Sequence, residues 1–118
     1  KIRQPFNVNY IAQKMAIASL GDKEYLRKSL NLNDMGMQFL KLELNKLGIE
    51  YLNTYTNFIT IHLGSKTQEI YEILLSEGVI LRPLENYGLP GYLRVTIGTK
   101  EENNMFIRKL KKSLKGLK

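Results

Sequence analysis

The 118-residue sequence contains no cysteine and only one histidine, His62. The absence of cysteine excludes disulfides, thiol nucleophiles and cysteine metal sites, so stability has to come from packing. No hydrophobic run approaches the roughly 18 to 20 residues that cross a bilayer. No hydrophobic segment of a signal peptide follows Lys1 either. We therefore expect a cytoplasmic protein that does not bind membranes.

The composition is that of an ordinary globular domain. Hydrophobic residues make up 43% of the chain and charged residues 25%, which excludes a disordered tail. The length is enough for one buried core. No repeat, linker or low-complexity segment interrupts the sequence. We therefore expect a single domain over residues 1–118.

The net charge of +7 raises the possibility of a nucleic-acid-binding module. The charge is uneven, however, because residues 100–118 hold seven basic and two acidic side chains, whereas residues 1–99 hold 11 and nine. The basic side chains of this last segment surround an apolar stripe at helical spacing, which is typical of a solvated helix face. We favour this interpretation and expect no nucleic-acid partner. A free-standing regulatory α+β domain is a further alternative.

Two helices are expected in the first half of the chain. Asn9 is placed to cap a helix over residues 10–20, whose small apolar side chains predict close packing. Asp22 is placed to cap a longer helix that ends near Gly48. Gly36 falls inside this second helix, and it predicts a bend or a break close by.

The second half mixes strand and helix patterns. Strands are expected over residues 57–63, 79–82 and 93–97. Ser65 and Gln68 form a capping-box pattern for a helix through residue 76, and Thr99 and Glu102 form another for the last helix. The resulting order predicts an α+β fold, with a small, mostly antiparallel or mixed sheet and helices packed on one of its faces.

Residues for catalysis are scarce. His62 lies in an expected strand, and nothing in the sequence marks a nucleophile for it to serve. The nine glycines form no phosphate-binding loop, and the acidic residues do not cluster as metal ligands. We therefore expect no catalytic residue, no metal site and no complete active site within this chain.

Two arginines are the strongest candidates for ligand binding. Arg94 lies on the polar side of an alternating strand, and Arg82 ends the preceding strand just before Pro83. If these strands pair, both guanidinium groups lie near one rim of the sheet. A guanidinium group binds a carboxylate or a phosphate through two parallel hydrogen bonds. The pattern therefore favours a ligand with two anionic ends, although solvated arginines at the strand ends, with or without pairing to Glu85, would also account for it.

Several stretches, spread over nearly the whole chain and in the same order, resemble the C-terminal small domain of histidinol-phosphate aminotransferases. They are RQPFNVN at 3–9, AQ at 12–13, NFI at 57–59, GVILRPL at 78–84, YGLP at 87–90 and LRVTIGT at 93–99. Together they form a specific pattern. The arginine-containing strand alone would be a weak one.

The resemblance implies a role for each arginine. The position of Arg94 binds the α-carboxylate of the amino acid, and that of Arg82 meets the phosphate of histidinol phosphate. The resemblance also implies pyridoxal phosphate, held as a Schiff base by a large domain of the same polypeptide that is absent from this chain, and a homodimeric parent. No lysine here matches the Schiff-base position, so we expect the chain alone to be inactive. Other pyridoxal-phosphate aminotransferases and threonine-phosphate decarboxylase stay open as relatives, because Leu81 and Asn86 depart from the commoner pattern.

Overall fold

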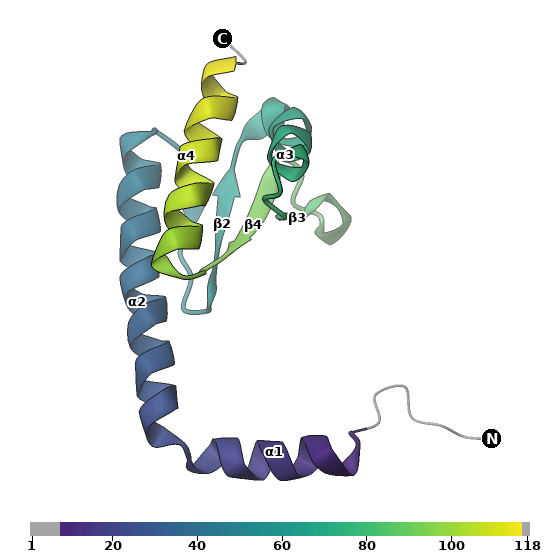
Figure 1. Ribbon diagram of the computed structural model, residues 1–118. Helices are drawn as coiled ribbons and strands as arrows, with labels where there is room; N and C mark the ends of the chain where they lie inside the picture. Colours follow the sequence, from purple (N-terminus) through teal and green to yellow (C-terminus); the bar gives the residue numbers. More distant parts are fainter. Residues whose placement is uncertain (1–7, 117–118) are drawn as a thin grey trace, which may run out of the picture. The chain divides into compact units, whose positions relative to one another are not determined.

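The structure is a computed structural model that describes residues 8–116, and its helices and strands are shown in Figure 1. Residues 3–7, which belong to the first stretch of the resemblance, lie outside the described part. The chain divides into two compact units, residues 1–31 and residues 32–118. The second unit contains the sheet and the three helical segments that bury its core.

The first unit consists of helix α1 (Tyr10–Gly21) and the beginning of helix α2 (Lys23–Lys46). Both expected caps are confirmed, because the backbone N–H of Ala12 donates to Asn9 at 2.8 Å and that of Tyr25 donates to Asp22 at 2.8 Å. The expected close packing of α1 is not found, since the helix has no buried residue. Its apolar side chains are spread around the helix, so they define no single face for packing.

Gly36 marks a close approach of α2 to the end of the sheet, and the break predicted near it is absent. Helix α2 is continuous from Lys23 to Lys46. A Cβ atom added at Gly36 would lie 2.5 Å from Cγ2 of Ile97 and 2.9 Å from Nδ2 of Asn103. Glycine in a helix interior costs about 1 kcal/mol relative to alanine, and here it gives the room in which α2 meets the end of the sheet.

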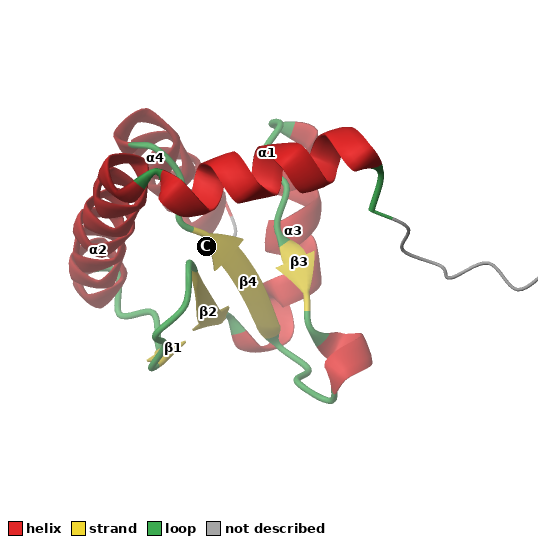
Figure 2. Cartoon of the chain, turned by 90° about the horizontal axis from the view of Figure 1, so that it is seen from below, coloured by secondary structure: helices red, strands yellow, loops and turns green. Residues whose placement is uncertain are grey.

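The second unit is built on a four-stranded antiparallel sheet with the strand order β1-β2-β4-β3 (Figure 2). The strands are β1 (Tyr51–Leu52), β2 (Phe58–His62), β3 (Arg82–Pro83) and β4 (Tyr92–Thr96). Sequence patterns missed β1, which is only two residues long. They also placed the third strand at 79–82, whereas it begins at Arg82. Val79 and Leu81 are buried in the core without pairing to a neighbouring strand, which explains the strand-like pattern of that segment.

Two helices follow the strands β2 and β4. Helix α3 (Thr67–Ser76) is preceded by a 3-10 turn, η1 (Gly64–Lys66). The capping box expected from Ser65 and Gln68 is therefore wrong, because the turn places Ser65 inside η1. Instead, the Thr67 hydroxyl lies 2.7 Å from the carbonyl oxygen of Gly64.

The second capping box is confirmed at the start of helix α4 (Lys100–Gly116). The backbone N–H of Thr99 donates to Glu102 Oε2 at 2.7 Å, and the backbone N–H of Glu102 lies 3.3 Å from Thr99 Oγ1. The two bonds satisfy two of the N–H groups that the first turn of a helix leaves unpaired.

Helices α3 and α4 lie on one face of the sheet (Figure 1), and the second half of α2 packs into the same core. The fully buried side chains are Leu40, Leu44, Ile59, Ile61, Ile70, Leu74, Leu93 and Leu110. The expected α+β fold with an antiparallel sheet and helices on one face is thus confirmed. Among residues 8–116, no helix has the length and hydrophobicity to span a membrane.

Candidate anion-binding site on the open face of the sheet

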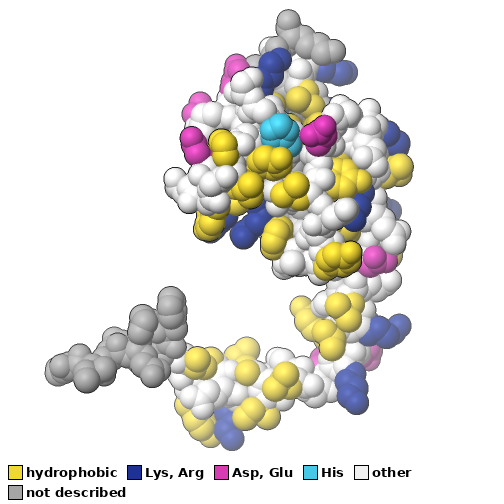
Figure 3. All heavy atoms as spheres, turned by 180° about the vertical axis from the view of Figure 1, so that it is seen from behind, with side chains coloured by type: hydrophobic (Ala, Val, Ile, Leu, Met, Phe, Trp, Pro, Cys, Tyr) yellow, Lys and Arg dark blue, Asp and Glu magenta, His cyan; other side chains and the backbone are white. Residues whose placement is uncertain are grey.

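The face of the sheet opposite the core helices bears aromatic and polar side chains. In β2, Ile59 and Ile61 are buried toward the helices, so Phe58 and His62 point to the other side. Figure 3 views the molecule from behind and shows hydrophobic side chains gathered around the histidine on this open face. The residues of β2, β3 and β4 on the open face are Phe58, Thr60, His62, Arg82, Tyr92, Arg94 and Thr96.

Arg82 and Arg94 are direct partners across the β3–β4 ladder. Residues opposite each other in an antiparallel pair lie on the same face, with Cβ atoms about 5 Å apart. The neighbours of Arg94 in β4, Leu93 and Val95, are buried under the helices, so both arginines belong to the open face. Two like charges in this arrangement disfavour folding unless a negative charge lies between them. The structure therefore brings together the two residues that the sequence singled out.

Each arginine contacts an aromatic side chain. The guanidinium carbon of Arg94 lies 5.0 Å from the ring centroid of Phe58, which is a cation–π contact. Nη1 of Arg82 donates a hydrogen bond to the hydroxyl of Tyr87 at 3.0 Å. Within residues 8–116, neither arginine forms an ion pair, and the alternative pairing to Glu85 is not found. Both guanidinium groups thus keep donors for an external anion.

The aromatic partners were not identified from the sequence. Phe58 reaches Arg94 only because Thr60 is the register partner of Arg94, which places Phe58 two residues along the neighbouring strand. Tyr87 reaches Arg82 because the chain turns back through a short 3-10 helix, η2 (Glu85–Tyr87). The sequence shows only that Tyr87 lies five residues after Arg82, and this spacing does not predict a contact between their side chains.

His62 lies at one end of the same face. Its ring stacks on Tyr92 with centroids 4.5 Å apart, and its Nδ1 atom is 3.8 Å from Oε2 of Glu50. No described contact joins His62 to a serine or threonine hydroxyl. The geometry agrees with a structural histidine that packs against an aromatic ring.

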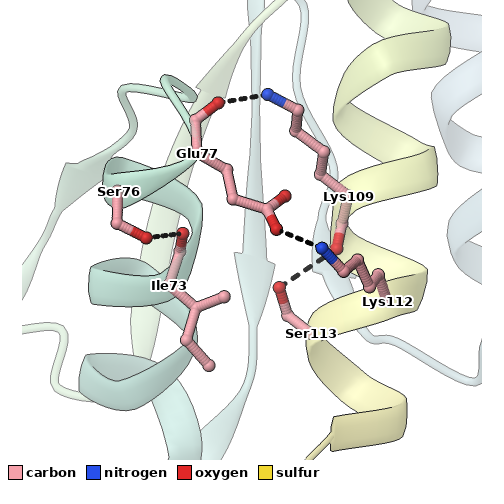
Figure 4. Close-up of polar contacts among 6 residues, drawn as sticks. All are labelled: Ile73, Ser76, Glu77, Lys109, Lys112 and Ser113. Carbon is pink, nitrogen blue, oxygen red and sulfur yellow. Dashed lines mark hydrogen bonds and ion pairs between the residues drawn. The ribbon is translucent and has the colours of Figure 1, made fainter.

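The lysines of α4 have a different environment from the arginines. The side chain of Lys109 donates to the backbone carbonyl of Glu77 at the end of α3, and Lys112 pairs with the Glu77 carboxylate at 2.7 Å (Figure 4). The hydrogen bond from Lys112 is the main cause that lowers the pKa of Glu77 below its ordinary value. A cation at the last carbonyls of a helix also interacts favourably with the helix dipole. These lysines attach α4 to α3.

Helix α2 provides the second acidic partner of α4. Glu43 pairs with Lys111 and with Lys46, each at 2.6 Å. Both hydrogen bonds lower the pKa of the Glu43 carboxyl, with the larger effect from Lys111. An open groove of about 590 Å³ runs beside this pair, with an apolar lining from Phe39 and Ile107 and cations along its edge. Two lysines of α4, Lys111 and Lys112, therefore pair with acids of the same chain.

The open face of the sheet does not fit the attachment of pyridoxal phosphate. That cofactor needs a lysine for the Schiff base and an acidic partner for its ring nitrogen. The open-face residues of β2, β3 and β4 include neither a lysine nor an acid. Lys111 and Lys112 are engaged with Glu43 and Glu77 on the opposite side of the sheet. Among residues 8–116, no group of three potential ligands could hold a metal ion.

Known proteins resemble the chain over nearly its full length. Histidinol-phosphate aminotransferase 2 of Pseudomonas fluorescens is 46% identical over 114 residues, covering 97% of this chain and 31% of that protein. Histidinol-phosphate aminotransferase 1 of Idiomarina loihiensis is 46% identical over 112 residues, covering 95% and 30%. The crystal structure of the histidinol-phosphate aminotransferase from Clostridium acetobutylicum aligns with a TM-score of 0.82 at 31% identity, covering 92% of this chain and 34% of that one.

The chain thus spans about a third of the length of the curated relatives it matches. The sequence model of the family described as aminotransferase class I and II matches residues 1–110, which is most of the chain. The chain therefore belongs to the class I and II aminotransferase family.

Proposed function

We propose that this chain is the substrate-binding small domain of a histidinol-phosphate aminotransferase. The complete enzyme would transfer an amino group between L-histidinol phosphate and 2-oxoglutarate, giving imidazole acetol phosphate and glutamate. The observation that carries the proposal is the cross-strand pair of Arg82 and Arg94, which has no acidic partner among residues 8–116. The names of the relatives that are 46% identical support the choice of substrate.

Each arginine has a distinct task in the proposal. Arg94 binds the α-carboxylate of glutamate or 2-oxoglutarate, and Arg82 meets the phosphate of histidinol phosphate. Histidinol phosphate has no α-carboxylate, so Arg94 serves chiefly the glutamate half of the reaction. A planar guanidinium group suits both anions because it donates two parallel hydrogen bonds.

The remaining parts of the enzyme belong, in this proposal, to a large domain of the same polypeptide. That domain holds pyridoxal phosphate, which acts as the electron sink for amino transfer. The short length relative to the relatives supports this division. The proposal also includes a homodimer in the cytoplasm, and it expects the isolated chain not to transaminate.

The test is Arg94→Ala in the complete polypeptide. Losing a charged hydrogen-bonded partner of the carboxylate should cost about 3 kcal/mol of transition-state stabilisation, roughly a hundredfold in kcat/KM for glutamate. Arg108→Ala removes the same side chain from the exposed surface of α4 and serves as the matched control.

An unchanged kcat/KM for glutamate in Arg94→Ala would refute the assigned role. Full activity on threonine phosphate with none on histidinol phosphate would move the chain to another branch of its family. The first measurement, on the variant, tests the role of the arginine, and the second, on the unmodified enzyme, tests the identity of the substrate.

A further inference from the structure

The hydrogen bond between Arg82 and Tyr87 leaves the hydroxyl hydrogen of Tyr87 without an acceptor in the part of the chain that the structure describes. Arginine only donates, so the Tyr87 oxygen is the acceptor of the 3.0 Å bond. The hydroxyl hydrogen of Tyr87 cannot point at the guanidinium group that donates to it. Tyr87 is 63% exposed, and its hydroxyl has no other partner among the described residues. Its hydrogen is therefore available to a group outside the protein.

The loop that bears Tyr87 is fixed at its base. The backbone N–H of Tyr87 donates to the carbonyl of Leu84 at 2.9 Å, and that of Leu89 donates to the same carbonyl at 3.2 Å. Leu84 is buried and donates its own N–H to Tyr92 in β4 at 3.1 Å. Gly88 closes η2 with a φ of 74°, a conformation that favours glycine. The position of the tyrosine relative to Arg82 is thus determined by the sheet.

Arg82 and Arg94 differ in the aromatic side chain that each one contacts. The side chain that holds Arg94 is the Phe58 ring, which has no hydrogen-bond donor. The side chain that holds Arg82 has a free O–H. A phosphate monoester has three terminal oxygens, so a two-pronged guanidinium contact leaves one for a further donor. The Arg82 end therefore offers a phosphate one more donor than the guanidinium group alone.

We propose that Tyr87 is a further substrate-binding residue, whose hydroxyl donates a hydrogen bond to the phosphate group that Arg82 holds. This inference rests on the proposed function and adds to it a residue that distinguishes phosphorylated from unphosphorylated substrates. Tyr87 also orients Arg82, because the bond it accepts holds one guanidinium nitrogen in place.

The experiment compares Tyr87→Phe with the unmodified enzyme, using the complete polypeptide and two amino donors, histidinol phosphate and histidinol. The substitution removes one oxygen and keeps the ring. We expect KM for histidinol phosphate to rise about tenfold, the effect of losing one hydrogen bond to a charged group. KM for histidinol and for glutamate should stay within about twofold. Tyr55→Phe is the matched control, because Tyr55 is fully exposed at 103%.

Arg82→Lys separates this inference from the proposed function. If Arg82→Lys weakens binding of histidinol phosphate and Tyr87→Phe does not, the role of Tyr87 is refuted while the proposed function stands. If Tyr87→Phe weakens histidinol and histidinol phosphate equally, the tyrosine is merely structural and the inference fails. If neither substitution distinguishes the two donors, the assignment of the phosphate to Arg82 fails with it.

Discussion

The two faces of the sheet differ in the side chains that surround their positively charged residues. On the helix side, Lys111 and Lys112 meet the carboxylates of Glu43 and Glu77, and each pair joins α4 to a different neighbouring helix. On the open side, Arg82 and Arg94 lie opposite each other beside aromatic rings, and neither forms an ion pair within the described part of the chain. Lys111 and Lys112 are thus compensated by acids of the same chain, whereas no ion pair compensates Arg82 or Arg94 among residues 8–116.

This contrast changes how the basic composition of the chain is interpreted. The net charge of +7 comes mostly from the last helix, and it first suggested nucleic acid as a partner. The proposed function instead depends on two arginines that contribute little to that total. Surface ion pairs usually add little to stability, so the paired lysines specify how the helices meet more than they strengthen the fold.

The sharpest test of the contrast uses neighbouring residues of β4. Leu93 is fully buried under the helices, whereas Arg94 lies on the open face. Leu93→Ala should lower the free energy of unfolding by about 2 to 5 kcal/mol, because it removes buried methyl groups and leaves a cavity. Urea denaturation measures this loss. Thr96→Ala, on the exposed end of the same strand, is the control and should change stability by less than about 0.5 kcal/mol.

A smaller effect is expected from acid on the helix side. The pKa values of Glu43 and Glu77 lie below the ordinary 4.5 in the folded chain. The unfolded chain therefore binds protons first as the pH falls. The contribution of these carboxylates to stability is complete above pH 4.5 and is lost as the pH falls through the lowered folded values. Denaturation midpoints measured at descending pH should fall less steeply in Glu43→Gln and Glu77→Gln. An unaltered slope in the double variant would contradict the pairing.

The smallest effect is expected on the open side. Arg82→Ala removes a side chain that faces another arginine and whose hydrogen bond to Tyr87 is exposed. The relief of like-charge repulsion and the loss of that bond should nearly cancel, leaving stability within about 0.5 kcal/mol. Thermal unfolding in buffer without phosphate or sulfate measures this change. A loss of several kcal/mol in the free energy of unfolding would show that the arginine is structural. It would also contradict the contrast drawn between the two faces of the sheet.

Local patterns were most reliable where a hydrogen bond joins residues close in sequence. The caps at Asn9, Asp22 and Thr99 all formed as expected. The cap at Ser65 did not form, because a 3-10 turn precedes the helix there. No break occurs near Gly36, and the reason for this glycine is the proximity of Ile97, far along the chain.

The sequence alone determined the capped starts of α1, α2 and α4, the apolar residues of β2 and β4 that face the helices, and the identity of the two arginines. Those features depend on side chains within a few residues of one another. Only the tertiary structure decided that Arg82 stands opposite Arg94 and that Phe58 and Tyr87 accompany them. Strand register is set by how the buried side chains of distant segments fit under the helices, and no local pattern encodes that fit.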